Sequence, residues 1–244
     1  MIDTILFEKH SFKGYTLIDG FPGYGLVGTI AANYLVDKLK MDFIGYVESK
    51  HFPPVSAIHN GKPMPPLRIY KNDKHKIVVF ISEFMFPKRL VYTMADTMYG
   101  WCEKNKIKKI VSMGGISIRG KQDEVFGLAS DSKELKVLGD SGVIPIKEGA
   151  TTGINALLLI KSSMNGKIPV VSLLAESKPD FVDPLGAALV LTALSDYLNI
   201  NIDTKDLIKE AAIIESKLKE SMESAQSADK THPEDAISHK LMYA

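Results

Sequence analysis

A glycine-rich turn near the start of the chain constrains the fold more than any other stretch. It follows an extended apolar run at residues 15–19 and precedes apolar residues that recur at helical spacing over positions 26–39. The turn therefore joins a buried strand to a helix. Its glycines match the G-x-G-x-x-G pattern of dinucleotide-binding turns. They are Gly23, Gly25 and Gly28.

The turn has two interpretations. In one, the amides of Gly25 and Leu26 bind a pyrophosphate, and Glu48, 20 residues beyond Gly28, binds the ribose. In the other, the glycines permit a tight turn and close packing of the helix on the sheet, with no ligand.

Strand and helix patterns alternate for about 200 residues, which predicts an α/β fold with a mostly parallel sheet covered on both faces. Strands are expected at residues 5–7, 15–19, 43–47, 77–81, 108–113, 126–128, 143–144 and 168–174. Helices are expected at residues 26–39, 87–105, 152–164 and 183–198. Proline-rich residues 53–70, with a turn at Asn60 and Gly61, predict antiparallel strands or a hairpin.

The C-terminal part has a different pattern. Residues 203–225 predict a long helix with an apolar stripe, which either mediates self-association or packs on its own domain. The small polar residues that follow predict a flexible tail. We therefore expect an α/β domain at 1–200, a helix at 201–226 and a tail at 227–244.

Composition disfavours several classes of partner and site. The chain has 30 Lys and Arg against 29 Asp and Glu, so no global field attracts nucleic acid or an anionic membrane. A single cysteine, Cys102, forms no disulfide within the chain. Neither a signal peptide nor a membrane span is evident, so a cytoplasmic location is expected.

Carboxylates follow several predicted strands. Because the carboxyl ends of parallel strands share one edge, some of them would meet there as acid–base groups or cation ligands, or would simply cap loops. They are Asp19, Glu48, Glu83 and Glu176. The six histidines lack the spacing of a zinc site, and residues 115–119 lack the second glycine of a hydrolase elbow. We therefore predict no catalytic residue, no metal and no cofactor.

The last residues form a compact apolar cluster that could dock on a partner. Met242 is apolar, Tyr243 has a flat ring with one polar tip, and Ala244 ends in a carboxylate that a lysine could bind.

Taken together, these features resemble the proteasome assembly chaperone 2 family in its archaeal branch. The resemblance rests on the turn from Gly20 to Gly28 and on further blocks at residues 54–58, 68–70, 114–115, 151–156 and 173–194.

This resemblance implies a fold similar to purine nucleoside phosphorylases without their catalytic site. It implies a homo-oligomer, such as a tetramer or pentamer, that acts as an assembly chaperone or an ATP-independent activator of the proteasome. Met242 would fill an apolar slot between α-subunits of the core particle, Tyr243 would fix the geometry, and the Ala244 carboxylate would meet a lysine.

Two other functions stay open at this stage. One is an enzyme that binds a small molecule or dinucleotide at the carboxyl edge, through Gly23, Gly25, Gly28 or the glutamates. The other is a scaffold whose long helix only mediates self-assembly.

Overall fold

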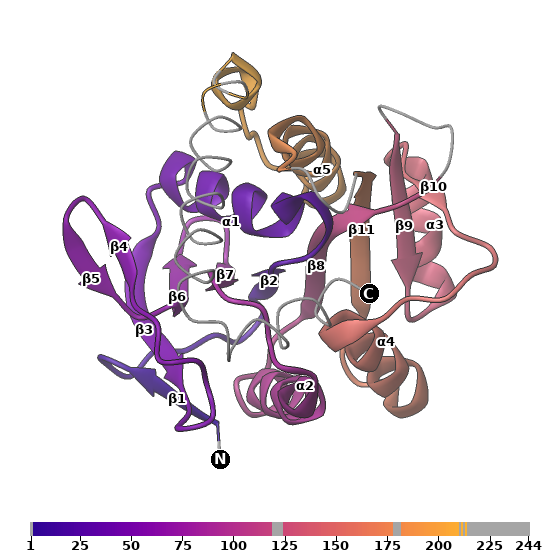
Figure 1. The fold of residues 1–244 in the computed structure, drawn as a ribbon. Coiled ribbons are helices and arrows are strands. Elements are labelled where there is room, and N and C mark those ends of the chain that lie inside the picture. The colour runs from indigo at the N-terminus through magenta and orange to yellow at the C-terminus, as the bar shows by residue number, and fades with distance from the viewer. Residues whose placement is uncertain (1, 119–123, 178–181, 210, 212, 214–244) are drawn as a thin grey trace, which may run out of the picture.

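The structure, a computed structural model, describes residues 2–118, 124–177, 182–209, 211 and 213. It confirms the α/β class: a large central sheet lies between two layers of helices (Figure 1). Within the described residues the main sheet has nine strands in the order β1-β3-β6-β7-β2-β8-β11-β9-β10. No described helix is long and apolar enough to cross a membrane.

The centre of the sheet is parallel, as the alternating pattern predicts. Its four strands are β7 (Ile77–Ser82), β2 (Thr16–Gly20), β8 (Lys109–Ile116) and β11 (Val170–Glu176). They are largely or wholly buried, because helices cover both faces.

The flanks of the sheet contain antiparallel pairs. On one side lie β6 (Leu67–Asn72), β3 (Asp42–Glu48) and β1 (Asp3–Leu6), each antiparallel to its inner neighbour. On the other side β9 (Val125–Ala129) runs antiparallel to β11, and β10 (Ile144–Pro145) is parallel to β9.

The predicted hairpin lies between β3 and β6. It consists of β4 (Ala57–His59) and β5 (Lys62–Met64), which form a separate small sheet beside the main one (Figure 1). Asn60 and Gly61 adopt positive φ values of 51° and 74°, as a two-residue hairpin turn requires.

Helices cover both faces of the sheet (Figure 1). Helices α1 (Val27–Lys38) and α5 (Pro184–Leu198) pack together on one face, and α2 (Lys88–Lys104) and α4 (Gly153–Asn165) pack together on the other. Successive residues of β2 point to opposite faces, so Leu17 joins the cluster under α2 while Ile18 joins the cluster under α1.

Helix α3 (Ser132–Asp140) lies beside β9 and β10 and is absent from the sequence prediction, which treats this region as irregular. Asp131 accepts a hydrogen bond from the Glu134 amide at 2.9 Å, and the helix carries buried Leu138. An N-cap aspartate followed three residues later by a glutamate is a helix-start signal. The glycines around this signal, which are typical of loops, obscure it in the sequence.

Of the predicted C-terminal helix, only residues 205–209, 211 and 213 are described, and these are helical. This start packs on the domain itself. Leu207 is buried in the cluster under α1, Lys38 pairs with Asp206 at 2.5 Å, and Tyr34 donates a hydrogen bond to the Asp203 carbonyl at 2.8 Å. The rest of the predicted helix, and Met242, Tyr243 and Ala244, lie outside the described residues.

Candidate functional site at the carboxyl edge of the sheet

The glycine turn satisfies much of its own hydrogen bonding. It forms a short 3-10 segment at Tyr24–Leu26, in which Gly25 has φ of 63° and Leu26 has φ of 51°. The Leu26 amide donates to the Gly23 carbonyl at 3.0 Å, and the Val27 amide donates to the Tyr24 carbonyl. A dinucleotide-binding turn leaves such amides free to bind the pyrophosphate. In this turn the Leu26 and Val27 amides already donate to backbone carbonyls, which disfavours pyrophosphate binding.

Side chains from the loop after β11 fill the space beside Gly25. A Cβ placed on Gly25 would lie 2.0 Å from the Ser177 hydroxyl oxygen and 2.9 Å from the Asp183 Cβ. The Asp183 amide donates to the Gly25 carbonyl at 2.8 Å. The turn is therefore fastened to the start of α5. A Cβ placed on Gly23 would meet no atom within 4 Å, so Gly23 can be approached from outside.

Gly28 allows α1 to pack directly on the sheet. A Cβ at Gly28 would lie 2.3 Å from the Met113 carbonyl oxygen of β8, and a Cβ at Gly20 would lie 2.1 Å from the Ala32 Cβ. These approaches leave no room for a side chain, so the two glycines have a packing role in this fold.

Glu48 does not lie beside the turn. Strands β7 and β6 separate β3 from β2, which places the end of β3 three strand spacings, roughly 14 Å, to the side. In a dinucleotide-binding βαβ unit the two strands are neighbours. The interpretation of Glu48 as the ribose partner of this turn is therefore wrong. The sequence could not reveal this, because β6 and β7 follow β3 in the chain and insert between β2 and β3.

Glu83 holds a buried arginine in place. Arg68 is 1% exposed and donates from Nη2 to Glu83, from Nε to the Tyr70 hydroxyl at 3.0 Å, and from Nη1 to the Pro65 carbonyl at 3.1 Å. His59 Nε2, on the hairpin, lies 2.8 Å from Glu83 Oε1. The Glu83 carboxylate thus links β6, the end of β7 and the hairpin. Its hydrogen bonds to Arg68 and His59 engage both of these partners without any ligand.

Glu176 ends β11 next to the turn. Its Oε2 atom and the neighbouring Ser177 hydroxyl are buried and have no hydrogen-bond partner among the described residues. The structure therefore brings Glu176, Gly25 and Gly28 to one part of the edge and places Glu83 and Glu48 farther along it. The carboxylates of Glu48, Glu83 and Glu176 therefore do not converge on a single centre.

Asp19 lies inside β2 and not at its end. It is 4% exposed and accepts a hydrogen bond from the Ser112 hydroxyl at 2.5 Å. Burial raises the pKa of Asp19 to about 7, although the Ser112 hydrogen bond acts in the opposite direction. Ser172, in register with Ser112, donates to the Asn155 amide oxygen at 2.8 Å. These side chains form a buried polar row between the sheet and helices α2 and α4.

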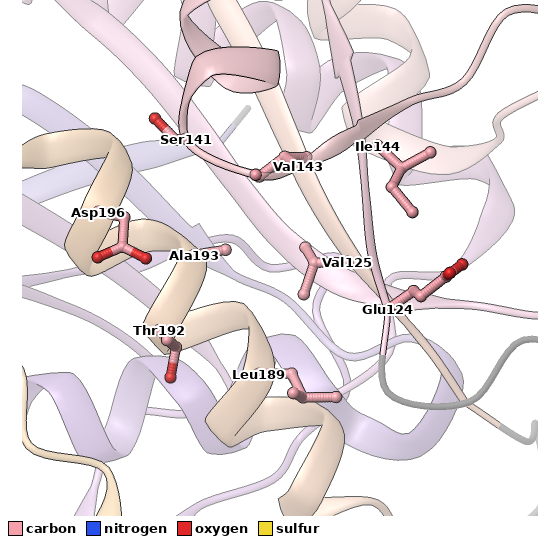
Figure 2. A pocket seen from close by; sticks show the side chains of 10 residues that line it. Glu124, Val125, Ser141, Val143, Ile144, Leu189, Thr192, Ala193 and Asp196 are labelled. Atoms are coloured by element: carbon pink, nitrogen blue, oxygen red, sulfur yellow. The ribbon is translucent and has the colours of Figure 1, made fainter.

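A pocket of about 240 Å³ opens between α5 and strands β9 and β10 (Figure 2). Figure 2 shows apolar Val125, Leu189 and Ala193 within it, with Glu124 at one end and Asp196 at the other. Its residues come from distant parts of the chain and share no sequence pattern. None of the predicted site residues that the structure describes lines it. Among the described residues, no group of three or more His, Cys, Asp and Glu side chains could hold a metal ion.

The comparison with known families identifies the chain. The PAC2 family profile matches residues 17–222, which include the turn, the whole described sheet from β2 onward and the start of the last helix. The chain belongs to the PAC2 family. Several blocks that suggested this family, including the turn, residues 54–58 and the end of β11, lie at or near the carboxyl edge.

Two archaea contain proteins similar to this chain. The chain is 35% identical to the uncharacterized protein MJ0106 of Methanocaldococcus jannaschii, over 90% of this chain and 92% of the relative. Pyrococcus furiosus PbaA, an archaeal homologue of proteasome-assembly chaperone, superimposes with a TM-score of 0.84 at 35% identity, over 94% of this chain and all of PbaA. PbaB of the same organism, an archaeal proteasome activator, has a TM-score of 0.74 at 25% identity, over 91% and 98%.

Proposed function

We propose that this protein is a non-enzymatic proteasome factor, a homo-oligomer that docks on the core particle through Met242, Tyr243 and Ala244. The observation that carries the proposal is the similarity along the whole domain to an assembly-chaperone homologue and, at lower identity, to a proteasome activator. The geometry of the carboxyl edge supports it, since the glycine turn is closed by hydrogen bonds and packing and the Glu83 carboxylate is engaged by Arg68 and His59.

Several tails on one oligomer would strengthen a contact that is weak for a single tail. A tripeptide buries little surface, whereas linked tails raise the effective concentration of the second and later contacts. The Tyr243 ring supplies the apolar area, and the terminal carboxylate of Ala244 supplies a charge for a lysine of an α-subunit.

The experiment compares binding of the wild type and Tyr243→Ala to the cognate core particle in a pull-down. Tyr92→Ala is the matched control. Tyr92 is 70% exposed on α2, so this substitution removes the same kind of ring from another surface. Loss of binding in Tyr243→Ala alone is expected. Equal binding of all three proteins would show that the tail is not the docking element. Sedimentation of the wild type gives the oligomer size.

A further inference from the structure

Four phenylalanine rings form a cluster at the carboxyl edge, beside β2 and β7. We call this cluster the aromatic edge, made of Phe21, Phe52, Phe84 and Phe86. Ring centroids lie 4.9 Å apart for Phe84 and Phe86, 5.0 Å for Phe52 and Phe84, and 5.2 Å for Phe21 and Phe86. The rings come from three loops that are distant in the sequence, so the fold assembles this surface.

The aromatic edge is partly open to solvent. Phe84 is buried, but Phe21, Phe52 and Phe86 are only partly covered, and Met85 beside them is 41% exposed. Val55, three residues after Phe52, is 48% exposed. Aromatic rings and methionine are enriched at the centres of protein interfaces, whereas scattered surface apolar residues carry no such meaning.

Basic residues flank the aromatic edge in both of its outer loops. Lys50 and His51 precede Phe52, and Lys88 and Arg89 follow Phe86 in the first turn of α2; all four are exposed. No carboxylate of the described residues pairs with Lys50, Lys88 or Arg89.

The acids near the aromatic edge offset only part of this charge. Exposed Glu48, two residues before Lys50, offsets one positive charge, while Glu83 is taken by Arg68 and His59. The first turn of α2 contains no acidic residue, although a helix N-terminus favours negative charge. The aromatic edge is therefore an apolar cluster whose flanking loop residues carry a net positive charge.

Apolar rings flanked by basic side chains suit a segment that is apolar and acidic. We therefore propose that the aromatic edge is a second docking surface, whose occupant is a partner-protein segment with aromatic or aliphatic side chains next to carboxylates. The apolar side chains of the segment cover Phe52, Met85 and Phe86. Its carboxylates meet Lys88 and Arg89, which steer the encounter and fix the orientation of the segment. This surface is independent of Met242, Tyr243 and Ala244, so the protein would bind two partners or two parts of one partner.

The test measures fluorescence anisotropy of a labelled synthetic peptide with two phenylalanines flanked by aspartates, added to the full chain. We expect binding with a Kd of tens of micromolar near 50 mM salt, weakened about fivefold near 300 mM because salt screens exposed charges. A peptide with lysines in place of the aspartates, and one with alanines in place of the phenylalanines, should each bind at least about tenfold more weakly.

Matched variants locate the binding. Arg89→Glu and Met85→Ser should each weaken the aspartate–phenylalanine peptide about fivefold or more. Lys104→Glu, at the other end of α2, and Met164→Ser, on exposed α4 surface, should leave its Kd unchanged. Far-UV circular dichroism and thermal unfolding confirm that each variant is folded.

Three results would overturn the proposal: no peptide binding below about 1 mM, an equal loss in the control variants, or a change of oligomer size in Arg89→Glu. The last would make this surface an interface between copies of the chain. Tyr243→Ala should bind the peptide like the wild type. Failure of the tail in the core-particle experiment therefore leaves this proposal intact, and failure here leaves the tail proposal intact.

Discussion

Asp19 accepts a 2.5 Å hydrogen bond from Ser112 on the neighbouring parallel strand, in the interior between the sheet and helices α2 and α4. A carboxylate there loses its hydration, and one hydroxyl donor does not replace it. Burial accordingly raises the pKa of Asp19 from 3.8 to about 7.

The raised pKa makes stability depend on pH in a defined direction. The folded protein holds the Asp19 proton up to about pH 7, whereas the unfolded chain releases it near pH 4. The contribution of protonated Asp19 to the free energy of unfolding is therefore full below pH 4 and is lost as pH rises through 7. At pH 8, Asp19→Asn should increase the free energy of unfolding by about 1–3 kcal/mol, measured with urea.

At pH 4.5 the Asp19→Asn variant should show little difference from the wild type. Asp37→Asn, on the exposed side of α1, is the control and should leave the pH profile unchanged. An identical pH dependence in wild type and Asp19→Asn would show that Asp19 is ionised in the fold at neutral pH.

Alanine substitution at two helix glycines should change the stability of the protein in opposite directions. Gly28→Ala places a Cβ 2.3 Å from the Met113 carbonyl oxygen, and neither backbone can yield locally, so a loss of at least about 2 kcal/mol is expected. Gly100→Ala on α2 meets nothing within 4 Å and should stabilise by about 0.5–1 kcal/mol through helix propensity. Thermal unfolding measures both, and a neutral Gly28→Ala would disprove the close approach of α1.

A buried ionic cluster joins β8, α3 and α5. Lys109 Nζ lies 2.8 Å from both Glu134 Oε2 and the Tyr197 hydroxyl, which itself donates to Glu134. Lys109→Met should cost about 3 kcal/mol, because it leaves the Glu134 charge buried and unpaired.

Adding Glu134→Leu to Lys109→Met should restore most of the lost stability, since an apolar pair replaces the ionic one. Urea unfolding of the single and double variants gives their coupling energy. The exposed Lys38–Asp206 pair is the control, and Lys38→Met should have no measurable effect. Additive effects of the two substitutions would show that the buried contact is not formed.

The Arg68 network predicts unequal roles for its two partners. Glu83→Ala should cost about 2–4 kcal/mol because Arg68 is 1% exposed and would lose its counter-charge. His59→Ala should cost less than about 1 kcal/mol, since the His59 side chain is 44% exposed. Hydrogen exchange of the hairpin amides should nevertheless increase in His59→Ala, because His59 ties the hairpin to Glu83. Unchanged exchange would remove this anchoring role.

Local patterns in the sequence determined most of the secondary structure. Apolar runs predicted the buried strands β2, β7, β8 and β11, because a strand covered on both faces contains almost no polar residue. Helical periodicity and the Asp183 cap predicted α5, and Asn60 with Gly61 predicted the hairpin turn. The resemblance in the turn and the further blocks also identified the family.

The tertiary structure decided which of these segments became neighbours. Insertion of β6 and β7 between β2 and β3 separated Glu48 from the glycine turn, and the loop after β11 filled the space beside Gly25. The tertiary structure also brought Phe21, Phe52 and Phe86 together and buried Asp19 against Ser112. Local patterns follow from each residue's own preferences, whereas strand order depends on how the whole core is best buried, which no short stretch encodes.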